Sequence, residues 1–225
     1  MVSNDRRSRW ASRLRTEGGF TFMELLIASA VTIVTMGVAV QVASQVQQGY
    51  TRQMDASAYE EEARFAIDWI VRALRQAGNN PYGITVSNCP AAGTAFVPLR
   101  LDPNANGLDD DVRINADVGQ PNALLGGDAG ACTEADEDLT IALDTANRTI
   151  TRQDNNLDAA PVAMTDGVIT GLQFTYLDAA RAVTANPAAV AFVSVAVTAQ
   201  STTANAQTGL FDTITLSSEV RLRSR

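Results

Sequence analysis

"YTRQMDASAYEEEARFAIDWIVRALRQAGNNPYG", residues 50–83, decides the fold of this chain. Apolar residues recur in it at steps of three and four, the spacing of one face of an α-helix. They are Ala63, Ala66, Ile70, Leu74 and Ala77. Charged residues take the other faces, and Gly78, two asparagines and Pro81 form a strong helix stop. The stretch predicts an amphipathic helix that packs its apolar stripe on a folded domain.

The helical pattern continues towards the N-terminus without a break. No charged residue occurs between Glu24 and Arg52, and no proline interrupts this part of the chain. An apolar segment of this length can cross a bilayer as a helix. We expect one helix of about 55 residues, with a membrane-embedded half at 20–48 and an amphipathic half at 49–80.

Basic residues precede the apolar segment. Five arginines lie before Gly18, against only Asp5 and Glu17; they are Arg6, Arg7, Arg9, Arg13 and Arg15. Positive charge ahead of a spanning helix keeps that end in the cytoplasm. We therefore expect a single-pass membrane protein whose N-terminus is cytoplasmic and whose C-terminal domain lies on the opposite side of the membrane.

Beyond Pro81 the apolar period changes to two, which is typical of strands. Residues 137–153 predict a hairpin that turns at Ala146-Asn147. Three more strands are expected within 166–179, 189–200 and 210–225.

The region 82–138 is rich in Gly, Asn, Pro and Asp, and we expect it to be irregular. Within it, the acidic cluster of Asp128 and 133–138 reads as a solvated loop. Residues 81–225 as a whole predict an antiparallel β domain. The expected fold class is α+β, with the long helix laid against the sheet.

Composition excludes several classes of function. The formal net charge of −8 becomes more negative without residues 1–19, which argues against nucleic acid as a partner of the folded domain. The chain of 225 residues contains no histidine, which removes His-based catalytic triads and His-ligated zinc. Cys89 and Cys132 are too few for a thiolate zinc site. In an exported protein they predict one disulfide, and two unpaired thiols are the alternative.

Glu24 stands out because a carboxylate within an apolar span is costly. A cleavable signal peptide, with Ala28-Ser29-Ala30 as its site, leaves Glu24 and the apolar run beyond that site unexplained. A plain anchor also leaves it unexplained. "GGFTFMELLIASAVTIV", residues 18–34, resembles the class III signal of type IV pilins and pseudopilins. That signal has a short basic leader ending in Gly, an aromatic first mature residue, and Glu at the fifth mature position.

The resemblance implies that residues 1–19 are a leader removed by prepilin peptidase. Cleavage would follow Gly19, the second residue of the Gly18-Gly19 pair, and Phe20 would become the N-methylated mature terminus. It also implies that Glu24 neutralises the Phe20 amine of a neighbouring subunit as a filament assembles. The chain would then be an assembly subunit and a substrate of the peptidase, rather than an enzyme. Its partners would be other pilins or pseudopilins. Before assembly it would lie in the lipid of the inner membrane with its C-terminal domain in the periplasm, and its destination would be the pilus or cell surface.

The C-terminal strands add a second resemblance. "GLQFTYLDA" and "DTITLSSEVRLRSR" are similar to the end of PilW-type minor pilins and of the related J-type pseudopilins of type II secretion. Major pilins typically carry a proline in the long helix and a disulfide close to the C-terminus, and this chain has neither feature. A minor pilin is therefore the first hypothesis and a J-like pseudopilin at a pseudopilus tip the second. An adhesin or binding module displayed on a pilus is a remoter third.

"LDPNANGLDDDVRI", residues 101–114, is a candidate calcium loop. Asp102, Asn104 and Asn106 match the first, third and fifth places of an EF-hand loop, with Gly107 at the sixth. Asp110 falls on the ninth place. The twelfth is Arg113 where a bidentate Glu is needed, so Asp109 or Asp111 would have to close the site. No cofactor is required by the sequence, and an Asx-rich turn is the competing interpretation of this loop.

An enzyme is the competing hypothesis from a different class of function. A membrane-anchored hydrolase could use paired carboxylates such as Asp110 and Asp138. Neither a nucleophile motif nor a metal triad accompanies them in the sequence. We therefore expect no catalytic site.

Overall fold

The computed structural model describes residues 19–79, 97–116, 135–205 and 208–222, with the backbone of 86–87 and 94–95. The chain divides into two compact units, Met1–Thr51 and Arg52–Arg225. A single helix, α1 (Phe22–Gln76), is 55 residues long and belongs to both units. The prediction of one continuous long helix is therefore confirmed.

The first half of α1 is exposed along its length. Every side chain from residue 22 to residue 51 is solvent-exposed, although most are apolar. By length and composition, α1 is long and apolar enough to cross a membrane, and none of its most apolar window is buried. This half is compatible with a membrane anchor.

The second half of α1 carries the predicted buried stripe. Its five members each expose at most 1% of their surface; they are Ala63, Ala66, Ile70, Leu74 and Ala77. The helix ends at Gln76, and Gly78 adopts a left-handed φ of 78°, which glycine reaches without a Cβ clash. The Gly78 N–H then donates to the Asn115 carbonyl at 3.1 Å. The predicted stop is confirmed.

All described strands pair antiparallel, in three sheets. The smallest joins β1 (Val86–Ser87) to β2 (Thr94–Ala95). The largest has the order β3 (Leu99–Leu101), β4 (Asp111–Asn115), β5 (Asp138–Asp144), β6 (Thr149–Asp154), β7 (Val162–Ala163). The third has the order β8 (Ile169–Leu177), β9 (Phe192–Ala204), β10 (Phe211–Arg221). The α+β class is confirmed.

The strands that the sequence predicts are present. β5 and β6 form the hairpin, with a turn over residues 145–148 that includes Ala146-Asn147. β8, β9 and β10 fall within the three further predicted segments, except that β9 continues to Ala204. Alternate residues of β9 face the core, from Val193 to Ser201, which is why its period-two pattern was readable.

The prediction that 82–138 is irregular is wrong for β3 and β4, and for the two-residue strands β1 and β2. The pattern hid β4 because its ends, Asp111 and Asn115, are polar, although they are 1% and 0% exposed. Only Val112 and Ile114 remain as apolar markers, too few for a recognisable alternation. β3 and β5 supply the hydrogen-bonding partners that make β4 a strand.

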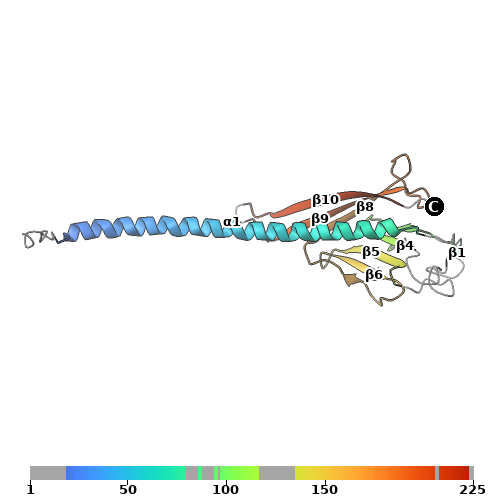
Figure 1. Cartoon of the computed structure of the whole chain (residues 1–225), viewed down its shortest axis with the longest axis horizontal. Coiled ribbons are helices and arrows are strands. Elements are labelled where there is room, and N and C mark those ends of the chain that lie inside the picture. The colour runs from blue at the N-terminus through green and yellow to red at the C-terminus, as the bar shows by residue number, and fades with distance from the viewer. Residues whose placement is uncertain are drawn as a thin grey trace, which may run out of the picture. The chain divides into compact units, whose positions relative to one another are not determined.

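One hydrophobic core joins the second half of α1 to both larger sheets. Both sheets run beside this part of the helix, and they contribute to one cluster of buried side chains (Figure 1). Ile70 and Leu74 of α1, Phe174 of β8, Val195 of β9 and Ile141 of β5 are all fully buried in it. The second half of α1 and the strands therefore both contribute to the stability of the second unit.

Candidate functional site

The start of α1 carries the residues that predict processing and assembly. Gly19 and Phe20 lie just before the helix, and Gly18 lies outside the described residues. Thr21 Oγ1 accepts a hydrogen bond from the Glu24 N–H at 3.3 Å. Thr21 is therefore the N-cap, and Thr-x-x-Glu is the spacing of a capping box. Glu24 also lies in the first turn of α1, where a carboxylate interacts favourably with the positive end of the helix dipole.

The capping role of Thr21 is not among the sequence-based predictions, although the Thr-x-x-Glu spacing is visible in the sequence. It gives Glu24 a local task in starting the helix in addition to the predicted pairing with a neighbour. Leu25, Leu26, Ile27, Val31 and Val34 follow on the same helix and are between 47% and 66% exposed. This apolar stretch of α1 is thus uncovered in the single chain.

Asp55 fastens α1 to the end of β9. Its Oδ1 accepts the Thr202 hydroxyl at 2.8 Å and its Oδ2 accepts the Thr203 hydroxyl at 2.9 Å. The backbone N–H groups of both threonines add bonds of 3.4 and 3.3 Å. Burial opposes ionisation of Asp55, but these hydrogen bonds outweigh it and lower the pKa of the carboxyl below 3.8. Helical periodicity gave no sign of this contact, because it depends on where β9 ends.

The candidate calcium loop, residues 102–111, joins β3 to β4. The Asp102 carboxylate accepts the N–H groups of Asn106 and Gly107 at 3.0 and 2.8 Å. Asn104 Oδ1 accepts the Asn106 N–H at 2.9 Å, and Asn106 Oδ1 accepts the Leu108 N–H at 2.7 Å. The loop therefore curls around its own side-chain oxygens. Asp110 lies to one side, where its Oδ1 accepts a 3.3 Å hydrogen bond from the Asn106 amide.

Asp111 differs from the other acids of the loop because it is buried. Its Oδ2 accepts the Asn104 N–H at 3.1 Å, while its Oδ1 is buried without a hydrogen-bond partner in the described structure. Burial raises the pKa of Asp111 to about 6; the Asn104 N–H opposes the shift, and Asp102, Asp110 and Asp109 add to it. Burial, followed by Asp109, Asp111 and Asp102, also raises the pKa of Tyr176. Three of the loop's carboxylates therefore act on one buried phenol.

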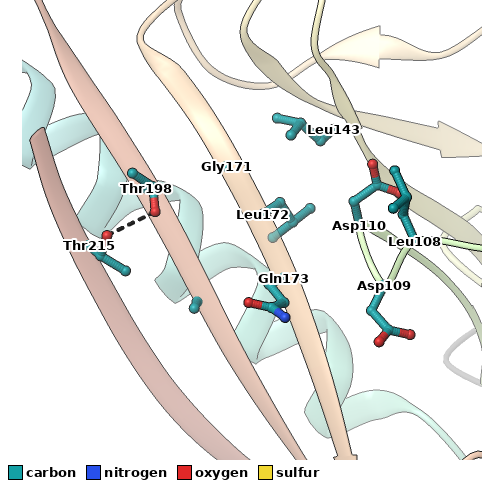
Figure 2. A pocket seen from close by; sticks show the side chains of 10 residues that line it. Leu108, Asp109, Asp110, Leu143, Gly171, Leu172, Gln173, Thr198 and Thr215 are labelled. Carbon is teal, nitrogen blue, oxygen red and sulfur yellow. Dashed lines mark hydrogen bonds between the residues drawn. The ribbon is translucent and has the colours of Figure 1, made fainter.

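An open cleft of about 370 Å³ lies beside this loop. Leu108, Asp109 and Asp110 line one side, with Leu143 of β5, and residues of β8, β9 and β10 line the other (Figure 2). Asp109 and Asp110 are its titratable groups. The opposite side carries uncharged polar side chains, such as Gln173, Thr198 and Thr215. The Thr198 and Thr215 hydroxyls bond each other at 2.9 Å. The cleft presents an acidic edge and no nucleophile–base pair among its lining residues.

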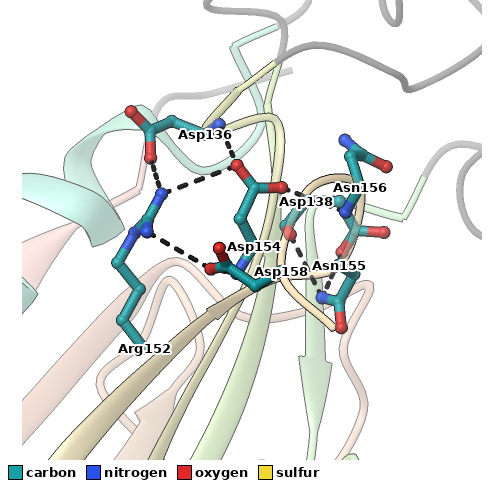
Figure 3. Close-up of polar contacts among 7 residues, drawn as sticks. All are labelled: Asp136, Asp138, Arg152, Asp154, Asn155, Asn156 and Asp158. Carbon is teal, nitrogen blue, oxygen red and sulfur yellow. Dashed lines mark hydrogen bonds and ion pairs between the residues drawn. The ribbon is translucent and has the colours of Figure 1, made fainter. Parts of the chain in front are cut away.

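The second acidic cluster is a set of ion pairs at one end of the β5–β6 hairpin. The Arg152 guanidinium lies 2.5 Å from Asp136, 3.5 Å from Asp154 and 3.4 Å from Asp158. Figure 3 shows these carboxylates gathered around it, with Asp138 and Asn155 alongside. Asp154 is fully buried and also accepts the N–H groups of Asp136 and Asn156. This cluster holds loops to the hairpin.

The interpretation of 133–138 as a solvated loop is therefore wrong for its last two residues. Glu137 and Asp138 are 0% and 1% exposed. Two guanidinium nitrogens of Arg113 donate hydrogen bonds to the Asp138 carboxylate at 2.6 and 2.5 Å. Sequence spacing could not show this, because Arg113 is brought there by the pairing of β4 with β5. Asp128 and residues 133–134 lie outside the described residues.

The carboxylate pair considered for a hydrolase does not come together. Asp138 pairs with Asn115 at one end of the β4–β5 ladder, whereas Asp110 precedes Asp111 at the other end. The two ends of β4 are four residue steps apart, about 13 Å of backbone. That exceeds the spacing of a carboxylate pair in glycosidases. Asp138 is also bound by Arg113 and the Asn155 amide, which commits it to an ion pair.

The predicted disulfide lies outside the described residues, since both Cys89 and Cys132 do. Within the described residues, no three acidic or cysteine side chains are gathered as metal ligands. The calcium set of Asp102, Asn104, Asn106 and Asp110 thus remains a prediction. Of the two candidates for the closing carboxylate, Asp109 and Asp111, the geometry draws attention to Asp111, whose buried Oδ1 has no hydrogen-bond partner in the described structure.

Comparison with known proteins adds no relative. No protein-family model, curated protein or solved structure matches this chain. Its function therefore has to be argued from its own residues.

Proposed function

We propose that this chain is a minor pilin, a structural and assembly subunit of a type IV pilus. Prepilin peptidase would cut it between Gly19 and Phe20, and the mature chain would leave the membrane to enter a filament or its priming complex. The observation that carries the proposal is the pairing of a pilin-like cleavage signal with one unbroken helix. The exposed apolar half of that helix leads directly into a half buried in a folded domain.

The continuity of α1 favours this proposal over a cleavable signal peptide. A conventional signal peptide is removed from the domain that follows it, whereas here the apolar segment and the core stripe belong to the same α1. A helix that is apolar on all sides needs lipid or other helices around it. Lipid before assembly and a bundle of neighbouring α1 helices afterwards would each meet that need.

Glu24 supports the choice of a filament over a plain anchor. Cleavage creates an ammonium on Phe20, and a buried carboxylate and ammonium stabilise each other where either one alone would be costly. A contact between Glu24 of one subunit and Phe20 of the next is heterologous, and such contacts do not close but build helical filaments. The Thr21 cap keeps Glu24 in the first helical turn, close to the new terminus.

Processing is the direct test of the proposal. The chain would be co-expressed with a prepilin peptidase, and the mass of its N-terminus measured. The expected product begins at Phe20 with one added methyl group, and Gly19→Val is expected to leave the precursor uncut. Gly49→Val is the matched control, because Gly49 is also open to solvent with nothing near its missing Cβ. Cleavage elsewhere, or cleavage of both variants alike, would contradict the proposal.

Filament membership is the second arm of the test. A tagged mature chain is expected in sheared pili at low copy. A J-like pseudopilin would instead co-purify with the type II secretion pseudopilus, and its deletion would stop secretion while leaving pili intact. The two machines are thus separated by which assembly carries the tag.

A further inference from the structure

The loop formed by residues 102–111 carries many side-chain oxygen atoms and a concentration of negative charge. The proposed function requires neither of them. Asp102, Asp109, Asp110 and Asp111 place four carboxylates within ten residues. Within the described part of the chain, no ion pair involves any of them. Carboxylate, amide and carbonyl oxygens are the ligands preferred by hard divalent cations.

Asp111 supplies an observation independent of this acidic composition. Its side chain is 1% exposed, and its Oδ1 is buried without a donor. A buried carboxylate oxygen without a partner lowers stability, so such an atom in a native structure calls for an explanation. The other oxygen, Oδ2, accepts the Asn104 N–H at 3.1 Å, which turns the carboxylate towards the start of the loop. A cation in the loop would satisfy the orphaned oxygen.

We propose that this loop binds one Ca²⁺ ion, with carboxylate oxygens from Asp102 and Asp111 and amide oxygens from Asn104 and Asn106. Two of these four ligands are asparagines, which is consistent with the absence of three gathered acids among the described residues. Calcium is favoured over magnesium because it accepts irregular sets of six to eight oxygens, whereas Mg²⁺ requires near-octahedral geometry and retains its water. The proposal is independent of the pilin assignment.

The position of the loop gives calcium a structural consequence. The Asp109 carbonyl accepts the Phe174 N–H of β8 at 2.7 Å, and the Asp110 carbonyl accepts the Leu143 N–H of β5 at 3.2 Å. The Tyr176 hydroxyl donates to the Asp111 carbonyl at 3.4 Å. The loop is thus hydrogen-bonded to strands of both larger sheets. An ion that orders it would hold the two sheets together and raise the unfolding temperature.

The test uses the full chain in detergent micelles, stripped of metal with EDTA. Its Tm is followed by circular dichroism while CaCl2 or MgCl2 is raised to about 5 mM, above the range of weak extracellular calcium modules. We expect calcium to raise the Tm by about 5 °C and magnesium to raise it much less. Tb³⁺ luminescence excited through nearby Tyr176 reports binding directly, and Ca²⁺ should quench it competitively.

Asp111→Asn is the decisive variant. It is expected to weaken calcium binding at least tenfold, while in EDTA it melts at or above the temperature of the parent, because a buried charge has been removed. Asp102→Asn, at a half-buried position, should weaken binding similarly. Asp144→Asn is the matched control: Asp144 also accepts backbone N–H groups in a turn, without the calcium spacing. It should leave calcium binding unchanged.

The outcomes separate clearly. A calcium-specific rise in Tm that Asp111→Asn abolishes and Asp144→Asn preserves supports the site. No shift with calcium, an equal shift with magnesium, or a full calcium shift in Asp111→Asn would each overturn it. None of these results bears on cleavage at Gly19, so the site and the proposed function can fail separately.

Discussion

At the scale of single residues, Asp55 is the side chain that hydrogen-bonds α1 to the end of β9 in the folded unit. Its carboxylate accepts four hydrogen bonds from Thr202 and Thr203 at the end of β9. Hydrogen bonds to a charged acceptor are stronger than those between neutral groups. The residue therefore links the stability of the domain to pH.

Asp55→Asn is expected to cost about 1 kcal/mol of unfolding free energy at pH 7, because the charged acceptor is lost. The pKa of Asp55 is lower in the folded chain than its ordinary 3.8, so the unfolded chain takes up the proton first as the pH falls. The stabilisation is full above pH 3.8 and disappears as the pH falls through the lowered pKa. Urea unfolding of parent and variant between pH 7 and pH 2.5 checks this, and a difference that does not shrink with acid would contradict it.

Glu24 is the residue on which assembly depends in the proposed function. Glu24→Ala is expected to insert in the membrane and to be cleaved normally, yet to enter filaments poorly, because the Phe20 amine loses its partner. Pelleting of sheared filaments followed by immunoblotting measures this. Glu61→Ala is a suitable control, since Glu61 is an exposed acid of the same helix. Normal incorporation of the Glu24 variant would remove the charge-pairing argument.

At the scale of elements, α1 is one helix whose first half is exposed and whose second half carries buried side chains. Its second half is part of the core, and Ile70 is fully buried there. Ile70→Ala is expected to cost about 2–5 kcal/mol of unfolding free energy, from lost apolar burial and a cavity. Phe65→Ala is the matched control, since Phe65 lies on the same helix at 44% exposure and should cost far less. Chemical denaturation of both variants measures the difference.

The β4–β5 ladder depends on an ion pair that is mostly buried. The Asp138 side chain is 2% exposed and that of Arg113 is 19% exposed. Arg113→Met leaves a buried carboxylate without its partner, and we expect it to lose about 3–5 kcal/mol of stability. Arg64→Met, which breaks the exposed helical pair with Glu60, should lose about 0.5 kcal/mol or less. Equal melting temperatures for the two variants would show that the strand pair does not need this contact.

At the scale of the whole molecule, the two units differ in what surrounds their apolar side chains. The described part of the first unit exposes all of them, whereas the second unit has its own core. A chain that begins at residue 49 is therefore expected to fold as a soluble domain with cooperative unfolding. Near-ultraviolet circular dichroism and a melting curve check this, and a molten or aggregated product would mean that the first half of α1 is needed for folding.

The sequence by itself determined the long helix, its buried stripe, its stop at Gly78 and five of the strands, β5, β6, β8, β9 and β10. Each is a local pattern, because the period of apolar residues follows from the geometry of the element that carries them. The pilin-like signal and the calcium spacing are local too, and both remain proposals. The tertiary structure alone decided that Asp111, Glu137 and Asp138 are buried, that β3 and β4 are strands, and that Asp55 meets β9. These features depend on partners distant in the sequence. The burial of a polar residue cannot be predicted from its neighbours in the chain, because only folding brings its hydrogen-bonding partners beside it or leaves it without one.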